Sequence, residues 1–128
     1  MFGMGKKRGD EPEVDAAVEE LAGADTVAFG GVGIAGTLLP VTEAYRRVEA
    51  ALAERPEAVR EKVDRLLRRG SPAGKAYAAT LLERVDPVAA RDAWSRLRED
   101  SGEFTTFSGC VMGSANLREY AADRLAGP

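Results

Sequence analysis

Residues 55–99 read RPEAVREKVDRLLRRGSPAGKAYAATLLERVDPVAARDAWSRLRE, and this stretch decides the fold. Three breaks divide it at regular spacing: Arg55-Pro56, Gly70-Ser71-Pro72 and Val85-Asp86-Pro87. Proline is tolerated at the first position of a helix, where its missing N–H would be unpaired in any case. Ser71 and Asp86 carry side-chain oxygens that can cap a helix, and Gly70 suits a left-handed residue that closes one. The pattern predicts short antiparallel helices separated by tight turns.

Apolar residues recur at helical spacing between these breaks and outside them. The segment 72–84 is rich in alanine and apolar on almost all sides, which is typical of a central helix with neighbours on several faces. The sequence predicts helices over residues 12–22, 38–53, 56–69, 72–84, 87–99 and 116–126. We therefore expect an all-α fold, a right-handed stack or bundle of five to six helices. It forms a single helical domain over residues 10–128, behind a disordered N-terminal tail of residues 1–9.

The segment SPAGKAYAATLL, residues 71–82, is followed by the turn Asp86-Pro87. This combination resembles the small-residue inner helix and the Asp/Pro turn of HEAT-type helical-repeat proteins. The resemblance covers residues 41–99. It implies a scaffold of stacked helices, commonly one that binds other proteins, and it carries no catalytic residue over to this chain.

The composition argues against several kinds of chemistry. The chain has no histidine, which removes Ser–His and Cys–His nucleophile pairs and every zinc site that includes histidine. The single cysteine, Cys110, cannot form an intrachain disulfide, so the fold needs no oxidising compartment and we expect the cytoplasm. The longest apolar stretch, residues 27–41, is too short and too rich in glycine to span a bilayer. We expect no catalytic residues, no metal and no cofactor.

The glycine-rich segment Gly31-Val32-Gly33-Ile34-Ala35-Gly36 matches the G-x-G-x-x-G pattern of dinucleotide-binding loops. Such a fold also needs a second parallel strand within a unit of about 30 residues, and residues 56–69 are helical instead. A flexible glycine loop is therefore the favoured interpretation. A single anion at the start of the following helix stays open.

Cys110 lies within FSGCVMG, residues 107–113. A free cysteine most often packs as a small hydrophobic residue, and its neighbours Val111 and Met112 favour that interpretation. The alternative is a reactive thiol, activated by the positive end of the helix that starts a few residues later. The candidate ligand-binding or redox residues are Cys110, Gly31, Gly33 and Gly36.

Charge is distributed unevenly along the chain, although the net charge is only −3. Residues 10–25 contain seven acidic residues and no basic ones, whereas residues 43–75 contain nine basic and six acidic ones. Either the acidic helix lies across the basic ones, or a basic ridge binds an acidic partner. The candidate partner-binding residues are Arg65, Arg68, Arg69 and Lys75. The negative net charge and the acidic first helix argue against a nucleic-acid partner.

Two segments, residues 26–36 and 103–113, interrupt the helical pattern with β-prone residues and glycines. We expect them to form a small irregular or two-stranded β element, and any site is expected where they meet. The leading hypothesis is a non-catalytic intracellular protein-interaction module, a regulator or inhibitor of a partner protein. The alternative is a small-molecule-binding, anion-binding or thiol-dependent protein that uses the Gly30–Gly36 loop and Cys110. Self-association is left open.

Overall fold

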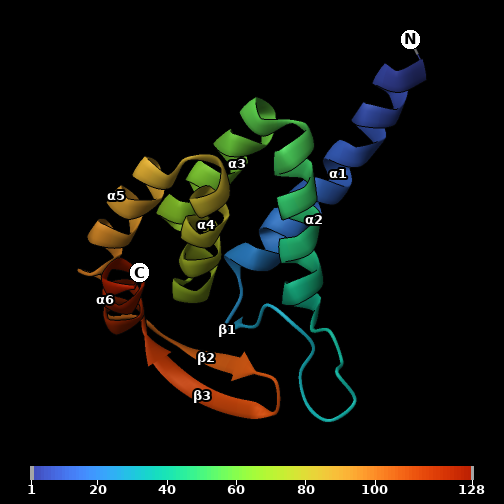
Figure 1. Cartoon of the computed structure of the whole chain (residues 1–128). Coiled ribbons are helices and arrows are strands. Elements are labelled where there is room, and N and C mark those ends of the chain that lie inside the picture. The colour runs from blue at the N-terminus through green and yellow to red at the C-terminus, as the bar shows by residue number, and fades with distance from the viewer. Residues whose placement is uncertain (1, 128) are drawn as a thin grey trace.

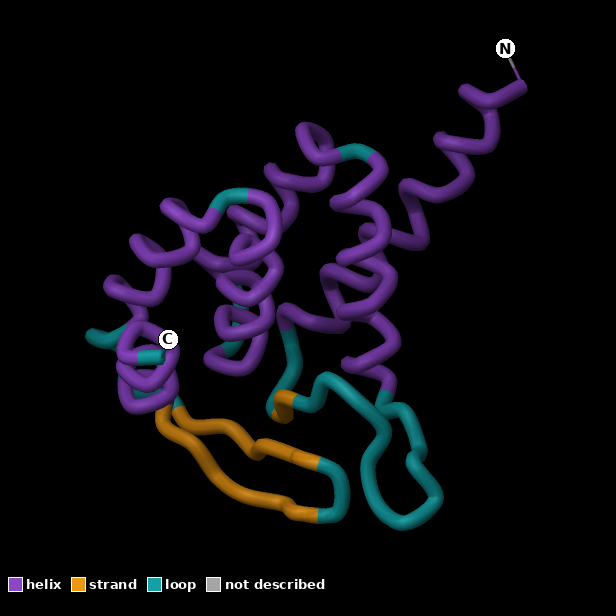
Figure 2. The backbone as a smooth tube through the Cα atoms, viewed as in Figure 1, coloured by secondary structure: helices purple, strands orange, loops and turns teal. Residues whose placement is uncertain are grey.

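The computed structural model describes the backbone of residues 2–127 and the side chains of residues 11–127. Over these residues the chain forms six helices and a small three-stranded sheet, which confirms the predicted helical fold with a β element (Figure 1 and Figure 2). The helices are α1 (Phe2–Ala22), α2 (Pro40–Glu54), α3 (Pro56–Arg69), α4 (Pro72–Val85), α5 (Pro87–Leu97) and α6 (Leu117–Ala126). The strands are β1 (Thr26–Val27), β2 (Glu103–Ser108) and β3 (Val111–Asn116).

The three breaks in the sequence are helix boundaries. A proline is the first residue of α3, α4 and α5. The Ser71 hydroxyl accepts a hydrogen bond from the N–H of Gly74 at 3.1 Å, and the Asp86 carboxylate accepts one from the N–H of Ala89 at 3.1 Å. Both predicted caps are confirmed, and each satisfies one of the unpaired N–H groups of a first helical turn.

Gly70 ends α3 in a different way from that predicted. Its φ of −73° is open to any residue, so the prediction of a left-handed residue is wrong. Glycine is needed there for space, because a Cβ would lie 2.6 Å from the carbonyl oxygen of Leu66. Helix α5 ends at Leu97 rather than at residue 99.

Helix α4 is the centre of the fold, as its alanine-rich sequence predicts. It packs against α3, α5 and α6 and also contacts α1, α2 and the first two strands. Its alanines and Tyr77, Leu81 and Leu82 are at most 1% exposed. Because alanine side chains are small, neighbouring elements can approach this helix closely on several sides.

Helix α1 begins at Phe2, well before the predicted start at residue 12, and includes Pro12. Its C-terminal half packs on the other helices through Val14, Ala17 and Leu21, which are buried, while its N-terminal end projects away from them (Figure 1). The structure gives residues 2–9 a helical backbone where the sequence predicts a disordered tail over residues 1–9, and Met1 lies outside the described residues. No helix within residues 2–127 is long and apolar enough to cross a membrane.

The sheet joins the two irregular segments and adds a third strand to them. Strand β1 runs parallel to β2, with Thr26 opposite Thr105, which confirms the predicted pairing. Strand β3 runs antiparallel to β2 along its whole length, with Phe104 opposite Ala115. Phe104 is buried and Ala115 packs against the core, so this face of the sheet covers the helices. The strand order β1-β2-β3 leaves β3 as an edge of the sheet.

Candidate functional site

The glycine loop and the β2–β3 turn meet at one end of the molecule (Figure 2). The N–H of Gly33 donates a hydrogen bond to the carbonyl oxygen of Gly109 at 3.1 Å. The loop is closed on itself by two hydrogen bonds between Val32 and Thr37, at 2.7 and 3.0 Å. The two segments that interrupt the helical pattern therefore form one structural unit, as the sequence predicts.

Each of the candidate glycines has a conformational reason to be glycine. Gly33 and Gly36 have φ values of +72° and +68°, a region that other residues rarely adopt. At Gly31 the constraint is space, because a Cβ would lie 2.3 Å from the carbonyl oxygen of Gly36. Within residues 2–127, the strand before this loop pairs with β2 of the hairpin and no dinucleotide-type βαβ unit follows it. The geometry fits a shaped surface loop.

A buried tyrosine fixes the chain just before the loop. The Tyr77 hydroxyl accepts a hydrogen bond from the N–H of Ala28 at 2.8 Å and lies 3.2 Å from the Ala28 carbonyl oxygen, to which it can donate. The Thr42 hydroxyl donates to the same carbonyl oxygen at 2.7 Å. The ring of Phe29 packs edge-on against Tyr45 and Tyr77, with centroids 5.0 and 5.4 Å apart. The loop therefore starts from an anchored position in the core.

The unit presents large apolar side chains to solvent. Ile34 is 101% exposed, Val111 is 69% exposed and Met112 is 67% exposed. We call this surface the loop–hairpin tip, made of residues 31–36 and 109–112. Isolated exposed apolar residues are ordinary, but these three lie on two segments that a hydrogen bond joins at one end of the molecule. Sequence reasoning located the segments but missed these side chains, because their exposure depends on the tertiary fold.

Cys110 is an exposed free thiol in the turn between β2 and β3. The interpretation of Cys110 as a buried hydrophobic residue is therefore wrong, and its neighbours Val111 and Met112 are exposed as well. The helix expected to activate the thiol, α6, begins at the far end of β3. A strand of that length extends for roughly 20 Å, which is too far for the helix terminus to act on the thiol.

The predicted basic residues do not form one ridge. Arg65 and Arg69 line a cleft of about 490 Å³ between α1 and α3, which Asp15 and Glu19 also line. Nearby, the Lys62 ammonium lies 2.6 Å from the Asp15 carboxylate, so the acidic first helix does lie across the basic one. The basic charge on this side is opposed by the acidic residues of α1.

The other two predicted basic residues, Arg68 and Lys75, line a separate cleft of about 510 Å³ between α3, α4 and α5. The Lys75 ammonium lies 3.1 Å from the Asp100 carboxylate. The hydrogen bond from the Gly102 N–H, and to a smaller extent the Lys75 ammonium, lower the pKa of Asp100 below its usual value. Lys75 is therefore already paired within the chain.

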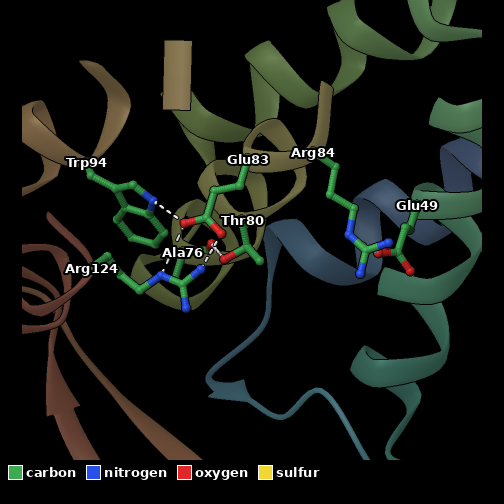
Figure 3. A network of polar contacts seen from close by, with 7 residues as sticks. All are labelled: Glu49, Ala76, Thr80, Glu83, Arg84, Trp94 and Arg124. Atoms are coloured by element: carbon green, nitrogen blue, oxygen red, sulfur yellow. Dashed lines mark hydrogen bonds and ion pairs between the residues drawn. The ribbon is translucent and has the colours of Figure 1, made fainter. Parts of the chain in front are cut away.

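A third cleft, of about 480 Å³, lies between α2, α4 and α6 and was not predicted. Glu83 at its edge accepts hydrogen bonds from the Trp94 indole at 2.9 Å and from Arg124, whose guanidinium also lies over the Trp94 ring (Figure 3). On the opposite side the Arg84 guanidinium lies 3.3 Å from the Glu49 carboxylate (Figure 3). These pairs join neighbouring helices, so the charges of this cleft serve the packing of α4. These residues come from different helices and meet only in the folded chain, so their spacing in the sequence could not predict the cleft.

Comparisons with known protein families, with curated proteins and with solved structures find no match to this chain. The resemblance of residues 41–99 to HEAT-type repeats therefore stays a prediction. Within residues 11–127, no group of three or more histidine, cysteine, aspartate or glutamate side chains is placed to hold a metal ion.

Proposed function

We propose that this protein is a non-catalytic cytoplasmic interaction module that regulates or inhibits a partner protein, and that the partner binds the loop–hairpin tip. The observation that carries the proposal is the exposure of Ile34, Val111 and Met112 on one hydrogen-bonded unit. Contact with a partner would remove these apolar surfaces from water, which is the main favourable term in most protein association.

The backbone of the tip favours binding because it is held in one shape. Gly33 and Gly36 set the turn of the loop, Gly109 sets the hairpin turn, and Tyr77 anchors the preceding chain through Ala28. A surface that is ordered before binding loses less conformational entropy when the partner arrives. The basic residues contribute less to the proposal, since they are divided between two clefts that also contain acidic residues.

The test is a quantitative cross-linked pull-down of the tagged chain from its native host, comparing three variants with the wild type. Ile34→Glu and Met112→Glu place a charge on the tip. Val88→Glu is the matched control, because Val88 is 79% exposed on α5 and lies outside the tip. We expect the same partner with the wild type and with Val88→Glu, and a loss of at least about tenfold with either tip variant. Equal recovery with all four proteins would contradict the proposal.

The exposed thiol supports a second candidate function, a small-molecule-binding, anion-binding or thiol-dependent protein that uses the Gly30–Gly36 loop and Cys110. Alkylation rates discriminate between the two. A rate for Cys110 in the folded chain well above that of a free model thiol supports this second function. An ordinary rate, together with a partner lost from the tip variants, favours the interaction module.

A further inference from the structure

The outer edge of β3 has backbone groups available for another strand. A two-residue turn, Gly109-Cys110, closes the hairpin on the pair Ser108 and Val111, so hydrogen-bonded and non-hydrogen-bonded pairs alternate from there. Met112 and Ser114 fall at non-hydrogen-bonded pairs, and their N–H and C=O groups point away from β2. Thr105 is the residue of β2 opposite Ser114, and its N–H donates to the carbonyl oxygen of Asp25 on the other side of β2. This hydrogen bond confirms the alternation.

This edge has none of the features that usually prevent pairing. The sequence of β3, VMGSAN, contains no charged residue and no proline, and its register with β2 is continuous and without a bulge. Natural proteins place charges, prolines or bulges on free edges to prevent unwanted strand addition. The absence of these features on β3 indicates an edge that is meant to be paired.

We propose that β3 pairs antiparallel with β3 of a second copy of this chain, with Gly113 at the two-fold axis. In this register, Met112 of each copy exchanges hydrogen bonds with Ser114 of the other. Gly113 lies opposite Gly113, and Val111 lies opposite Ala115. Each exposed valine thus faces a small residue on the same face of the sheet, so large and small side chains are complementary across the axis.

The proposed pairing ends at two copies. It joins the two sheets into one of six strands, whose outer edges are the two copies of β1. Strand β1 is only two residues long, so it offers no further edge for a third copy. Ile34 and the outward face of Met112 stay available, so the dimer would carry two loop–hairpin tips. The inference goes beyond the proposed function and does not rest on it, because self-pairing is measured on the purified chain alone.

The test is sedimentation equilibrium of the purified full chain, up to about 0.2 mM. The variant Ser114→Pro removes the outward N–H and leaves the hydrogen bonds to β2 in place, because proline is tolerated at such positions of an edge strand. Ser114→Ala keeps the N–H and is the matched control. We expect the wild type and Ser114→Ala to dimerise, and Ser114→Pro to raise the dissociation constant at least about tenfold. A monomeric wild type, or equal dimerisation of all three proteins, would overturn the proposal.

A second pair of variants protects the test against a folding defect. Met112→Lys places a charge on the exposed edge, with Met112→Gln as its control, and neither change alters a buried residue. Only the lysine variant should weaken the dimer. The register is tested by oxidation in a Cys110→Ser background, where Gly113→Cys should cross-link two copies and Ala115→Cys should not. Cross-linking through residue 115 but not through residue 113 would overturn the assigned register.

Discussion

The hydroxyl of Tyr77 is one of the contacts that hold the loop–hairpin tip to the helical core, and its removal gives the most informative stability prediction. Tyr77 is 0% exposed and Ala28 is 1% exposed, so their hydrogen bond at 2.8 Å is shielded from water. The variant Tyr77→Phe keeps the ring and its packing but leaves the N–H of Ala28 without a partner. The Ala28 carbonyl oxygen keeps its hydrogen bond from Thr42.

A buried donor that loses its partner destabilises a fold by about 1–3 kcal/mol, so we expect Tyr77→Phe to lower the free energy of unfolding by about 2 kcal/mol. For a chain of this length, that loss corresponds to a fall in the melting temperature of roughly 7 °C. Urea unfolding followed by circular dichroism measures the first quantity, and a thermal melt measures the second. Hydrogen exchange should also show faster exchange of the Ala28 amide and of the loop that follows it.

The matched control is Tyr45→Phe. Tyr45 belongs to the same aromatic cluster, with its ring centroid 5.5 Å from that of Tyr77. Within residues 11–127 no side-chain oxygen or nitrogen is both fully buried and without a hydrogen-bond partner, and this includes the Tyr45 hydroxyl. This change should alter stability by no more than about 0.5 kcal/mol. If the two variants lose equal stability, or if Tyr77→Phe loses none, the assigned anchor is refuted.

Three further predictions concern other contacts. Gly31→Ala should destabilise the fold by about 1–3 kcal/mol, because its Cβ would lie 2.3 Å from Gly36, whereas Gly30→Ala, with nothing within 4 Å, should have little effect in the same thermal melt. Glu83→Gln should lower stability by about 1–2 kcal/mol and shift the fluorescence of Trp94, since it weakens the hydrogen bonds from Arg124 and from the indole. The control is Glu49→Gln, whose partner Arg84 is 74% exposed, and it should change stability by less than about 1 kcal/mol. Burial raises the pKa of Tyr77 and of Tyr45 to about 12, so the unfolded chain releases these protons at a lower pH than the folded chain. The free energy of unfolding should therefore fall as the pH rises from 10 to 12, and a flat profile over that range would contradict the assigned burial.

The helices could be predicted closely because their signals are local. Prolines and capping side chains fix the start of α4 and α5 through contacts within a few residues, and Ser71 and Asp86 cap them as predicted. The role of Gly70 could not be predicted, because the limit on its side chain comes from the close approach of the Leu66 carbonyl oxygen rather than from its own φ.

Strand β3 was only partly predictable. Its residues Gly113, Ser114 and Asn116 have low intrinsic preference for strands, and its pairing depends on the turn at Gly109-Cys110 and on the partner strand β2. The sequence thus indicated a site where two irregular segments meet, but not a third strand or a free edge.

The exposed tip could not be predicted for a related reason. Val111, Met112 and Cys110 have the composition of a buried segment, and only the position of the hairpin at one end of the molecule places them in solvent. The basic residues show the same limit. Helical spacing groups Arg65 with Arg69, but the positions of α1 and α5 decide which cleft each basic side chain lines.

The most direct test of the central claim is site-specific photo-cross-linking in the native host, with a photoreactive amino acid at position 34 or at position 88. Both positions are highly exposed, but only Ile34 lies on the loop–hairpin tip. We predict that position 34 cross-links to one partner protein that position 88 does not capture. The same products from both positions, or a specific product from position 88 alone, would contradict the account.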